Sequence, residues 1–133
     1  MRKVLIDTNV YSSFKRNDSD IVSTFQHFDF IGISITVLGE LYAGFSGSTR
    51  EKYNRQELEK FINSPRVNFI NTDIDTADFY AQIFNSLKKK GSPIPSNDIW
   101  IAASALQHGL ALFTLDKHFK YVDGLILIEK ITI

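Results

Sequence analysis

The stretch Val4-Leu5-Ile6-Asp7-Thr8-Asn9 joins a run of wholly apolar residues to an abrupt polar segment. Three consecutive apolar residues predict a short strand that is buried on both faces, as in the centre of a parallel sheet. The polar residues end this strand, and Val10, Tyr11 and Phe14 follow at helical spacing. The stretch therefore predicts a central strand that opens directly into a helix.

The same alternation of apolar runs and helical patterns continues along the chain. Further strands are predicted at residues 30–35, 67–70, 110–114 and 125–128. Further helices are predicted at residues 21–28, 36–45 with Thr36 as the N-cap, 48–64, 75–90 with Gly91 as the stop, and 96–108 with Ser96 as the N-cap. Strands that alternate with helices predict an α/β fold around a largely parallel sheet. The C-terminal ends of such strands open on one edge, where functional sites form.

The composition fits a single globular domain over residues 1–133, because 44% hydrophobic and 23% charged residues are enough for one core. Cysteine is absent, which excludes thiol catalysis and cysteine-bound zinc and agrees with a reducing cytoplasm, the expected location. The longest apolar runs are too short for a membrane span. Fifteen basic residues balance fifteen acidic ones, so any contact with nucleic acid must be local.

Four carboxylates lie at positions that a parallel sheet would bring together. Asp7 and Asp116 each follow a predicted strand, and Glu40 and Asp98 lie in the opening turns of predicted helices. Carboxylates held a few ångströms apart raise one another's pKa, so their convergence calls for a compensating cation. Because all the ligand atoms are oxygens, Mg²⁺ or Mn²⁺ is expected. Such an ion activates water and stabilises charge on a phosphodiester, which is the chemistry that cleaves nucleic-acid backbones.

Each acid also has a simpler explanation when it is taken alone. Carboxylates at strand ends and helix N-termini are often caps or solvated surface groups. Two other phosphoryl-transfer folds are disfavoured: an aspartate-nucleophile phosphatase would need an acid where the chain has Asn9, and a receiver domain would need paired acids near Met1-Arg2-Lys3. The functional prediction therefore depends on the joint pattern of the four acids.

Four segments together resemble the successive motifs of VapC-type PIN domains. These segments are Leu5-Ile6-Asp7-Thr8-Asn9, Ile35-Thr36-Val37-Leu38-Gly39-Glu40-Leu41, Ser96-Asn97-Asp98-Ile99-Trp100-Ile101-Ala102-Ala103 and Thr114-Leu115-Asp116-Lys117-His118-Phe119. They follow the family's order and cover nearly the whole chain. The resemblance implies a PIN-like three-layer fold and a Mg²⁺-dependent endoribonuclease that is the toxin of a toxin–antitoxin system.

The resemblance also implies roles for individual residues. The acids would form the metal site, with Asp7 and Asp98 as the principal ligands and Glu40 and Asp116 as the others. Asn9 and Thr114 match positions that support the acids by hydrogen bonds. Some PIN domains carry a further acid two residues after the fourth, where this chain has His118.

Basic residues beside the last motif are candidates for contact with RNA. Lys117 and Lys120 follow the last acid closely, and Lys117 is expected to bind the substrate. The three histidines lack the spacing of zinc ligands. A structural or solvent-facing role is expected for His118, with contact to a phosphate near the site as the alternative. Trp100 is expected to pack beneath the site.

The resemblance implies three partners: a cognate VapB-type antitoxin, an RNA substrate and a second copy of the chain. Eleven phenylalanines exceed what one core obviously needs, so segments 10–14 and 53–62 are expected to line an apolar groove for the antitoxin's C-terminal segment. The alternative function is a catalytically inactive PIN-like scaffold that binds protein or RNA. Such a scaffold would be expected to lack some of the acids, and all four are present.

Overall fold

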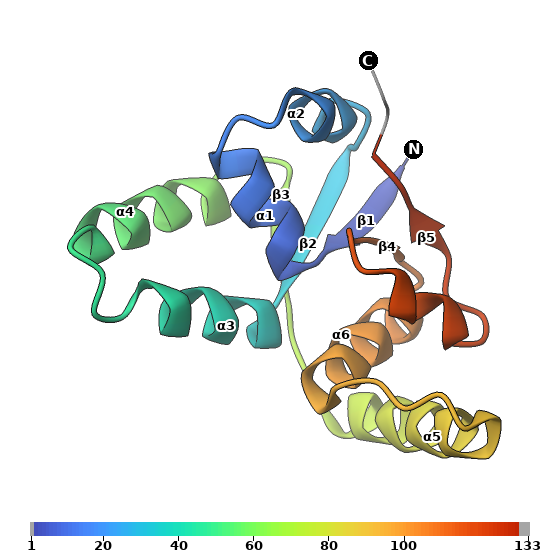
Figure 1. Cartoon of the computed structure of the whole chain (residues 1–133). Helices are drawn as coiled ribbons and strands as arrows, with labels where there is room; N and C mark the ends of the chain where they lie inside the picture. Colours follow the sequence, from blue (N-terminus) through green and yellow to red (C-terminus); the bar gives the residue numbers. More distant parts are fainter. Residues whose placement is uncertain (1, 131–133) are drawn as a thin grey trace.

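A computed structural model describes residues 2–130, along which strands and helices alternate (Figure 1). The strands are β1 (Lys3–Ile6), β2 (Phe30–Ser34), β3 (Val67–Ile70), β4 (Ala111–Phe113) and β5 (Leu127–Ile128). The helices are α1 (Thr8–Lys15), α2 (Ser19–Phe25), α3 (Ile35–Phe45), α4 (Glu51–Ile62), α5 (Ile74–Lys90), α6 (Ser96–Gln107) and the 3₁₀ helix η1 (Lys117–Tyr121). The predicted α/β fold is confirmed.

The five strands form one parallel sheet in the order β3-β2-β1-β4-β5. The chain runs from β1 outward through β2 to β3 and then returns to the other side of β1 as β4. The register places Leu5 opposite Gly32 of β2 on one side and opposite Leu112 of β4 on the other. The direction of strand order therefore reverses between β1 and β4, and at such a switch point the C-terminal ends of the strands leave a crevice.

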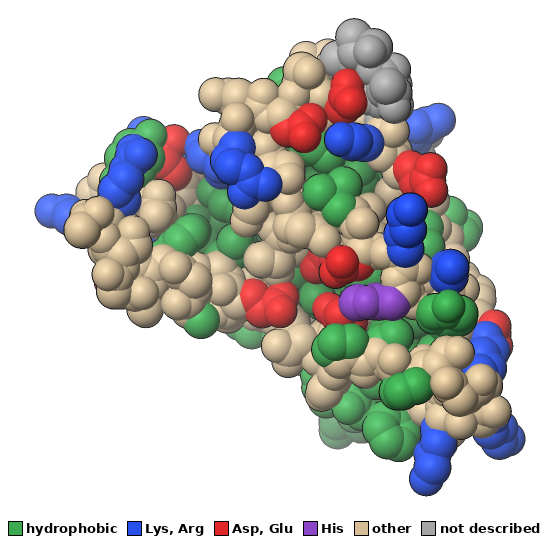
Figure 2. All heavy atoms as spheres, viewed as in Figure 1, with side chains coloured by type: hydrophobic (Ala, Val, Ile, Leu, Met, Phe, Trp, Pro, Cys, Tyr) green, Lys and Arg blue, Asp and Glu red, His purple; other side chains and the backbone are tan. Residues whose placement is uncertain are grey.

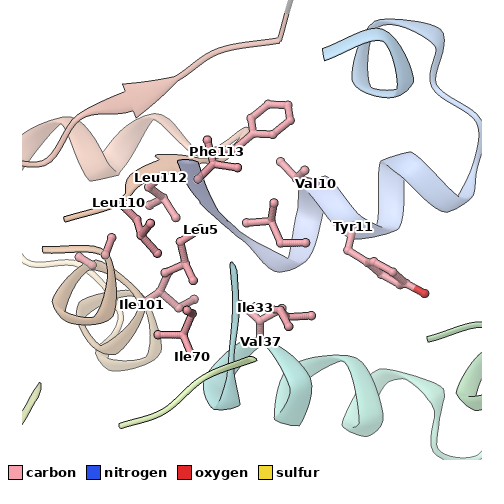
Figure 3. Packing of buried hydrophobic residues seen from close by; sticks show 14 of the residues in the cluster. Leu5, Val10, Tyr11, Ile33, Val37, Ile70, Ile101, Leu110, Leu112 and Phe113 are labelled. Atoms are coloured by element: carbon pink, nitrogen blue, oxygen red, sulfur yellow. The ribbon is translucent and has the colours of Figure 1, made fainter. Parts of the chain in front are cut away.

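The predicted central strand is the most deeply buried part of the sheet. Val4, Leu5 and Ile6 are each at most 1% exposed, because neighbouring strands cover their edges and helices cover their faces. Figure 3 shows Leu5 among apolar side chains from β2, β3, β4 and α6, and Figure 1 shows α1 to α4 on one side of the view and α5 with α6 on the other. Burial of β1 fixes the position of Asp7, the residue that follows it.

A glycine permits the closest approach inside the sheet. A Cβ atom on Gly32 of β2 would lie 2.9 Å from Cγ1 of Ile70 and 3.2 Å from Cδ1 of Leu5. Real Cβ atoms essentially never come within 3.0 Å of such a neighbour. The absence of a side chain at position 32 therefore lets Ile70 of β3 pack directly over the central strands.

The structure corrects several predicted element ends. Ser34, not Thr36, caps α3, because its buried hydroxyl accepts a hydrogen bond from the Val37 amide at 3.3 Å. Pro95, not Ser96, precedes α6, and no side chain caps that helix. The helix predicted at 48–64 is shorter, the strand predicted at 30–35 ends one residue early, and those predicted at 110–114 and 125–128 shorten to β4 and β5. The predicted stop of α5 is confirmed by Gly91, whose φ of 69° lies in the left-handed region.

Many of the aromatic residues pack in or against the hydrophobic core. Phe14 of α1 stacks on Phe25 of α2 with ring centroids 4.5 Å apart, and Phe61 of α4 lies 6.3 Å from Phe25. The rings expected to face a groove thus partly pack against one another, and Tyr53 remains outside this cluster at 49% exposure.

No helix within residues 2–130 combines the length and the apolar character that a bilayer crossing requires.

Candidate metal centre

Asp7 occupies the turn from β1 into α1 and is the most buried of the four acids. Its side chain is the N-cap of α1: Oδ1 accepts a hydrogen bond from the Thr8 amide at 2.8 Å. Only 4% of the residue is exposed, and this burial raises the pKa of the carboxyl to about 6. The Asp98 and Asp116 carboxylates raise it further, while hydrogen bonds from Thr114 and Thr8 oppose the rise.

Thr114 connects the ends of β1 and β4. Its hydroxyl donates to Asp7 Oδ2 at 2.7 Å and accepts from the Asp116 amide at 3.0 Å. The residue is 7% exposed, so these bonds are shielded from water. The threonine therefore fixes the Asp7 carboxylate and the start of the Asp116 segment relative to each other.

Asp98 lies in the first turn of α6, beside His118 of η1. Its Oδ2 is 2.7 Å from His118 Nε2, an ion-pair distance when the imidazole is protonated. Burial raises the pKa of Asp98, His118 lowers it, and Asp116 and Glu40 raise it. His118 thus meets a carboxylate directly, a contact that the expectation of a structural or solvent-facing role missed.

Glu40 is half-buried in α3, and a hydrogen bond from Thr8 holds its carboxylate. The Thr8 hydroxyl donates to Glu40 Oε1 at 2.6 Å. Thr8 was not among the predicted site residues. Its position next to Asp7, at the first residue of α1, was the available signal, because that position faces the same edge of the sheet.

The four acids form one electrostatic cluster. Asp7 is repelled by Asp98 and Asp116, and Asp98 is repelled by Asp116 and Glu40. Figure 2 shows acidic side chains gathered in the middle of one face with a histidine beside them. Across residues 2–130 the ion pairs of lysines and arginines involve none of these four acids. The positive charge that would let the acids stay ionised together is that of a divalent cation.

The donor atoms suit such an ion. Within the described part of the chain, Asp98, Asp116 and His118 form a group whose ligand atoms all lie within 4.8 Å of one another. Asp7 and Glu40 border this group through the repulsions with Asp98. Carboxylate oxygens with one imidazole nitrogen can bind hard or borderline divalent metals.

Residues 4–125 match the family model of the PIN domain. The chain belongs to the PIN-domain family. It is 32% identical over 128 residues to ribonuclease VapC2 of Rickettsia felis, covering 92% of this chain and 94% of the relative. It is 27% identical over 135 residues to ribonuclease VapC4 of Mycobacterium tuberculosis, covering 100% of this chain and 98% of the relative.

Solved structures of VapBC complexes contain chains with the same fold as this PIN domain. The crystal structure of VapBC2 from Rickettsia felis bound to a DNA fragment from their promoter contains a chain with a TM-score of 0.86 and 26% identity, covering 96% of this chain and 98% of that one. A chain of VapBC-1 from nontypeable Haemophilus influenzae has a TM-score of 0.83 and 27% identity, covering 95% and 96%. The fold and the family agree.

The two remaining predicted residues of this PIN domain lie at the border of the cluster. Asn9 Oδ1 accepts a hydrogen bond from the Leu115 amide at 3.3 Å, so Asn9 holds the segment that carries Asp116. Lys117 is exposed and lines a hollow between η1 and β5, which Asp116 also lines. Trp100 stacks on Tyr80 of α5 with ring centroids 4.2 Å apart.

Proposed function

We propose that this PIN domain is a metal-dependent endoribonuclease that acts as the toxin of a toxin–antitoxin pair. The convergence of four carboxylates from separate elements at the switch point of the sheet carries the proposal. Two of them have raised pKa values, and neither pairs with a lysine or arginine within residues 2–130. Relatives named as VapC ribonucleases over nearly the full length of both chains support it.

Asp7, Glu40, Asp98 and Asp116 are the proposed ligands of Mg²⁺ or Mn²⁺. When bound, the ion would neutralise the cluster, lower the pKa of a water molecule and stabilise charge on a phosphodiester. The protein's part is to hold the acids in place before substrate arrives. Thr114 fixes Asp7 and Thr8 fixes Glu40 through hydrogen bonds of 2.7 and 2.6 Å, so neither carboxylate must be ordered during the reaction.

The proposed path of the RNA backbone runs beside Asp116. Lys117 and Lys120 line the hollow between η1 and β5, together with Glu129 and with Lys130, which pairs with Asp18 and Asp20. Because the chain has no net charge, Lys117 and Lys120 would supply the local attraction that the whole molecule lacks. Of these two lysines, Lys117 is the one next to the acid cluster, and we assign it to a phosphate near the cleaved bond.

The proposed partners are a VapB-type antitoxin and a second copy of the chain. The structural neighbours described above are VapBC complexes, one of them bound to promoter DNA. A hollow between α1 and α4, lined by Tyr11, Phe45 and Tyr53 with several charged residues, lies between the two segments predicted as groove walls. Its mixed lining fits a segment that has both apolar and charged side chains.

A cleavage assay with matched variants tests the enzymatic proposal. Purified, antitoxin-free protein should cleave RNA with Mg²⁺ or Mn²⁺ and stop when EDTA is added. Asp98→Asn should lower the rate by at least about a hundredfold, because a ligand and its charge are lost. Asp75→Asn is the control, since Asp75 also lies in the first turn of a helix but is exposed and takes no part in the repulsions that raise the pKa values of Asp7 and Asp98.

Cleavage that survives exhaustive chelation, or an Asp98→Asn variant with the wild-type rate, would contradict the metal-dependent mechanism. A folded wild-type protein that binds RNA without cutting it under any divalent metal would instead support the alternative of an inactive scaffold. The partner proposal is tested separately, by co-expression with the product of the adjacent reading frame. Failure of the two proteins to co-purify, or full cleavage by their complex, would contradict it.

A further inference from the structure

His118 stands at the border of the acid cluster, on a backbone that the core holds in place. It belongs to η1, and the next residue, Phe119, is fully buried. The imidazole packs against the Phe119 ring with centroids 4.9 Å apart. Just before η1, the Asp116 amide donates a hydrogen bond to the Thr114 hydroxyl at 3.0 Å. The histidine is therefore positioned by the fold before any ligand binds.

The imidazole directs a poorly satisfied nitrogen toward the acids. Nε2 of His118 is buried, and no atom of residues 2–130 gives it a well-aligned hydrogen bond. Its close neighbour is Asp98 Oδ2, at 2.7 Å. A buried nitrogen normally has a partner, and a divalent cation held between this nitrogen and the Asp98 carboxylate would supply one.

The spacing of the donor atoms fits one shared ion. Ligand atoms at about 2.1 Å from an octahedral ion lie about 3 Å apart when adjacent and about 4.2 Å apart when opposite. His118 Nε2 and Asp98 Oδ2, at 2.7 Å, are close to the adjacent spacing. Asp116 completes a group whose atoms all lie within 4.8 Å, so shifts of less than about an ångström would bring all three onto one ion.

We propose that His118 is a direct ligand of the metal, together with Asp98 and Asp116, and that this nitrogen makes the site prefer Mn²⁺ to Mg²⁺. The inference rests on the metal centre proposed above and assigns it one further ligand. Mg²⁺ binds oxygen almost exclusively and retains its waters, whereas imidazole suits the first-row transition metals. A histidine at this position therefore contributes no negative charge to the metal site, but its nitrogen favours Mn²⁺ over Mg²⁺.

Pulsed electron paramagnetic resonance of the Mn²⁺-loaded, RNA-free protein tests the inference directly. Nitrogen bound to Mn²⁺ modulates the electron spin echo, and an all-oxygen site does not. We expect ¹⁴N modulation in the wild type and its loss in His118→Gln. His27→Gln and His108→Gln are the controls and should keep the modulation, because both residues lie outside the cluster. Thermal unfolding of each variant shows that the fold is retained.

Calorimetric titration supplies a second measurement. His118→Gln should weaken Mn²⁺ binding by about tenfold or more and leave Mg²⁺ binding within about threefold, whereas His118→Asp should shift the preference toward Mg²⁺. Mn²⁺ that binds the wild type without ¹⁴N modulation, or an unchanged Mn²⁺ to Mg²⁺ preference in His118→Gln, overturns the inference and leaves the metal centre standing. Mn²⁺ that binds wild type and Asp98→Asn alike refutes the metal centre itself, and the inference with it.

Discussion

Asp7→Asn should stabilise the metal-free protein while abolishing cleavage. Burial and two neighbouring carboxylates raise the pKa of Asp7 from 3.8 to about 6, so ionised Asp7 is unfavourable in the folded state. At about 1.4 kcal/mol per pH unit between the two values, the penalty above pH 6 is about 3 kcal/mol. Asparagine removes the charge and keeps the oxygen that accepts from the Thr8 amide. The Thr114 hydroxyl loses its carboxylate acceptor, which costs about 1 kcal/mol.

The net expectation is a gain of about 2 kcal/mol in the free energy of unfolding near pH 7.5, or about 8 °C in the midpoint of thermal unfolding. The sign depends on pH. Because the folded pKa is raised, the contribution of Asp7 to the stability of the wild type is fully present below the unfolded pKa of 3.8 and is lost as the pH rises through about 6. The advantage of the variant should therefore vanish below about pH 4 and reach its full value above about pH 6.

Urea unfolding in EDTA across this pH range is the assay, with Asp29→Asn as the control. Asp29 is an exposed acid, so its replacement should change stability by less than about 0.5 kcal/mol at every pH. Adding Mg²⁺ or Mn²⁺ should stabilise the wild type and have little effect on Asp7→Asn. If the metal-free Asp7→Asn variant is no more stable than the wild type at about pH 7.5, the reasoning is refuted. Burial and the neighbouring carboxylates would then not destabilise the ionised Asp7 side chain.

Three further substitutions test the supports of the site and the sheet. Thr114→Val should raise the pKa of Asp7 further and slow cleavage by about tenfold, with Thr114→Ser close to wild type in a pH–rate profile. Thr8→Val should release Glu40 and lower the cleavage rate with the fold intact by circular dichroism, whereas Thr8→Ser should not. Gly32→Ala should destabilise the protein by about 1–3 kcal/mol in urea unfolding, because the new Cβ atom meets a side-chain carbon at 2.9 Å; a neutral effect would show that the sheet can yield there.

The positions of Asp7 and Asp116 were predictable because Asp7 directly follows β1 and Asp116 comes shortly after β4, and the strands of a parallel sheet end on one edge. The contacts that fix them were harder to predict. The Thr8–Glu40 bond spans 32 residues, and the approach of His118 to Asp98 depends on how η1 packs against α6. The predicted N-cap of α3 was wrong for a local reason. Ser34 and Thr36 are both residue types that cap helices well, and the end of β2 at Ser34 decided which of them is the cap.

The sequence by itself determined the alternation of strands and helices, the burial of β1, and the placement of Asp7 and Asp116 after strands and of Asp98 in a helix opening, because apolar periodicity and turn residues act over a few neighbouring positions. Glu40 was expected in the opening turns of its helix and lies instead in the middle of α3. Only the tertiary structure decided that β4 returns beside β1, that Asp7 is the acid buried to 4% exposure, and that a histidine faces Asp98. Strand order, desolvation and charge repulsion all depend on residues that are distant in sequence and meet only when the sheet and its helices pack together.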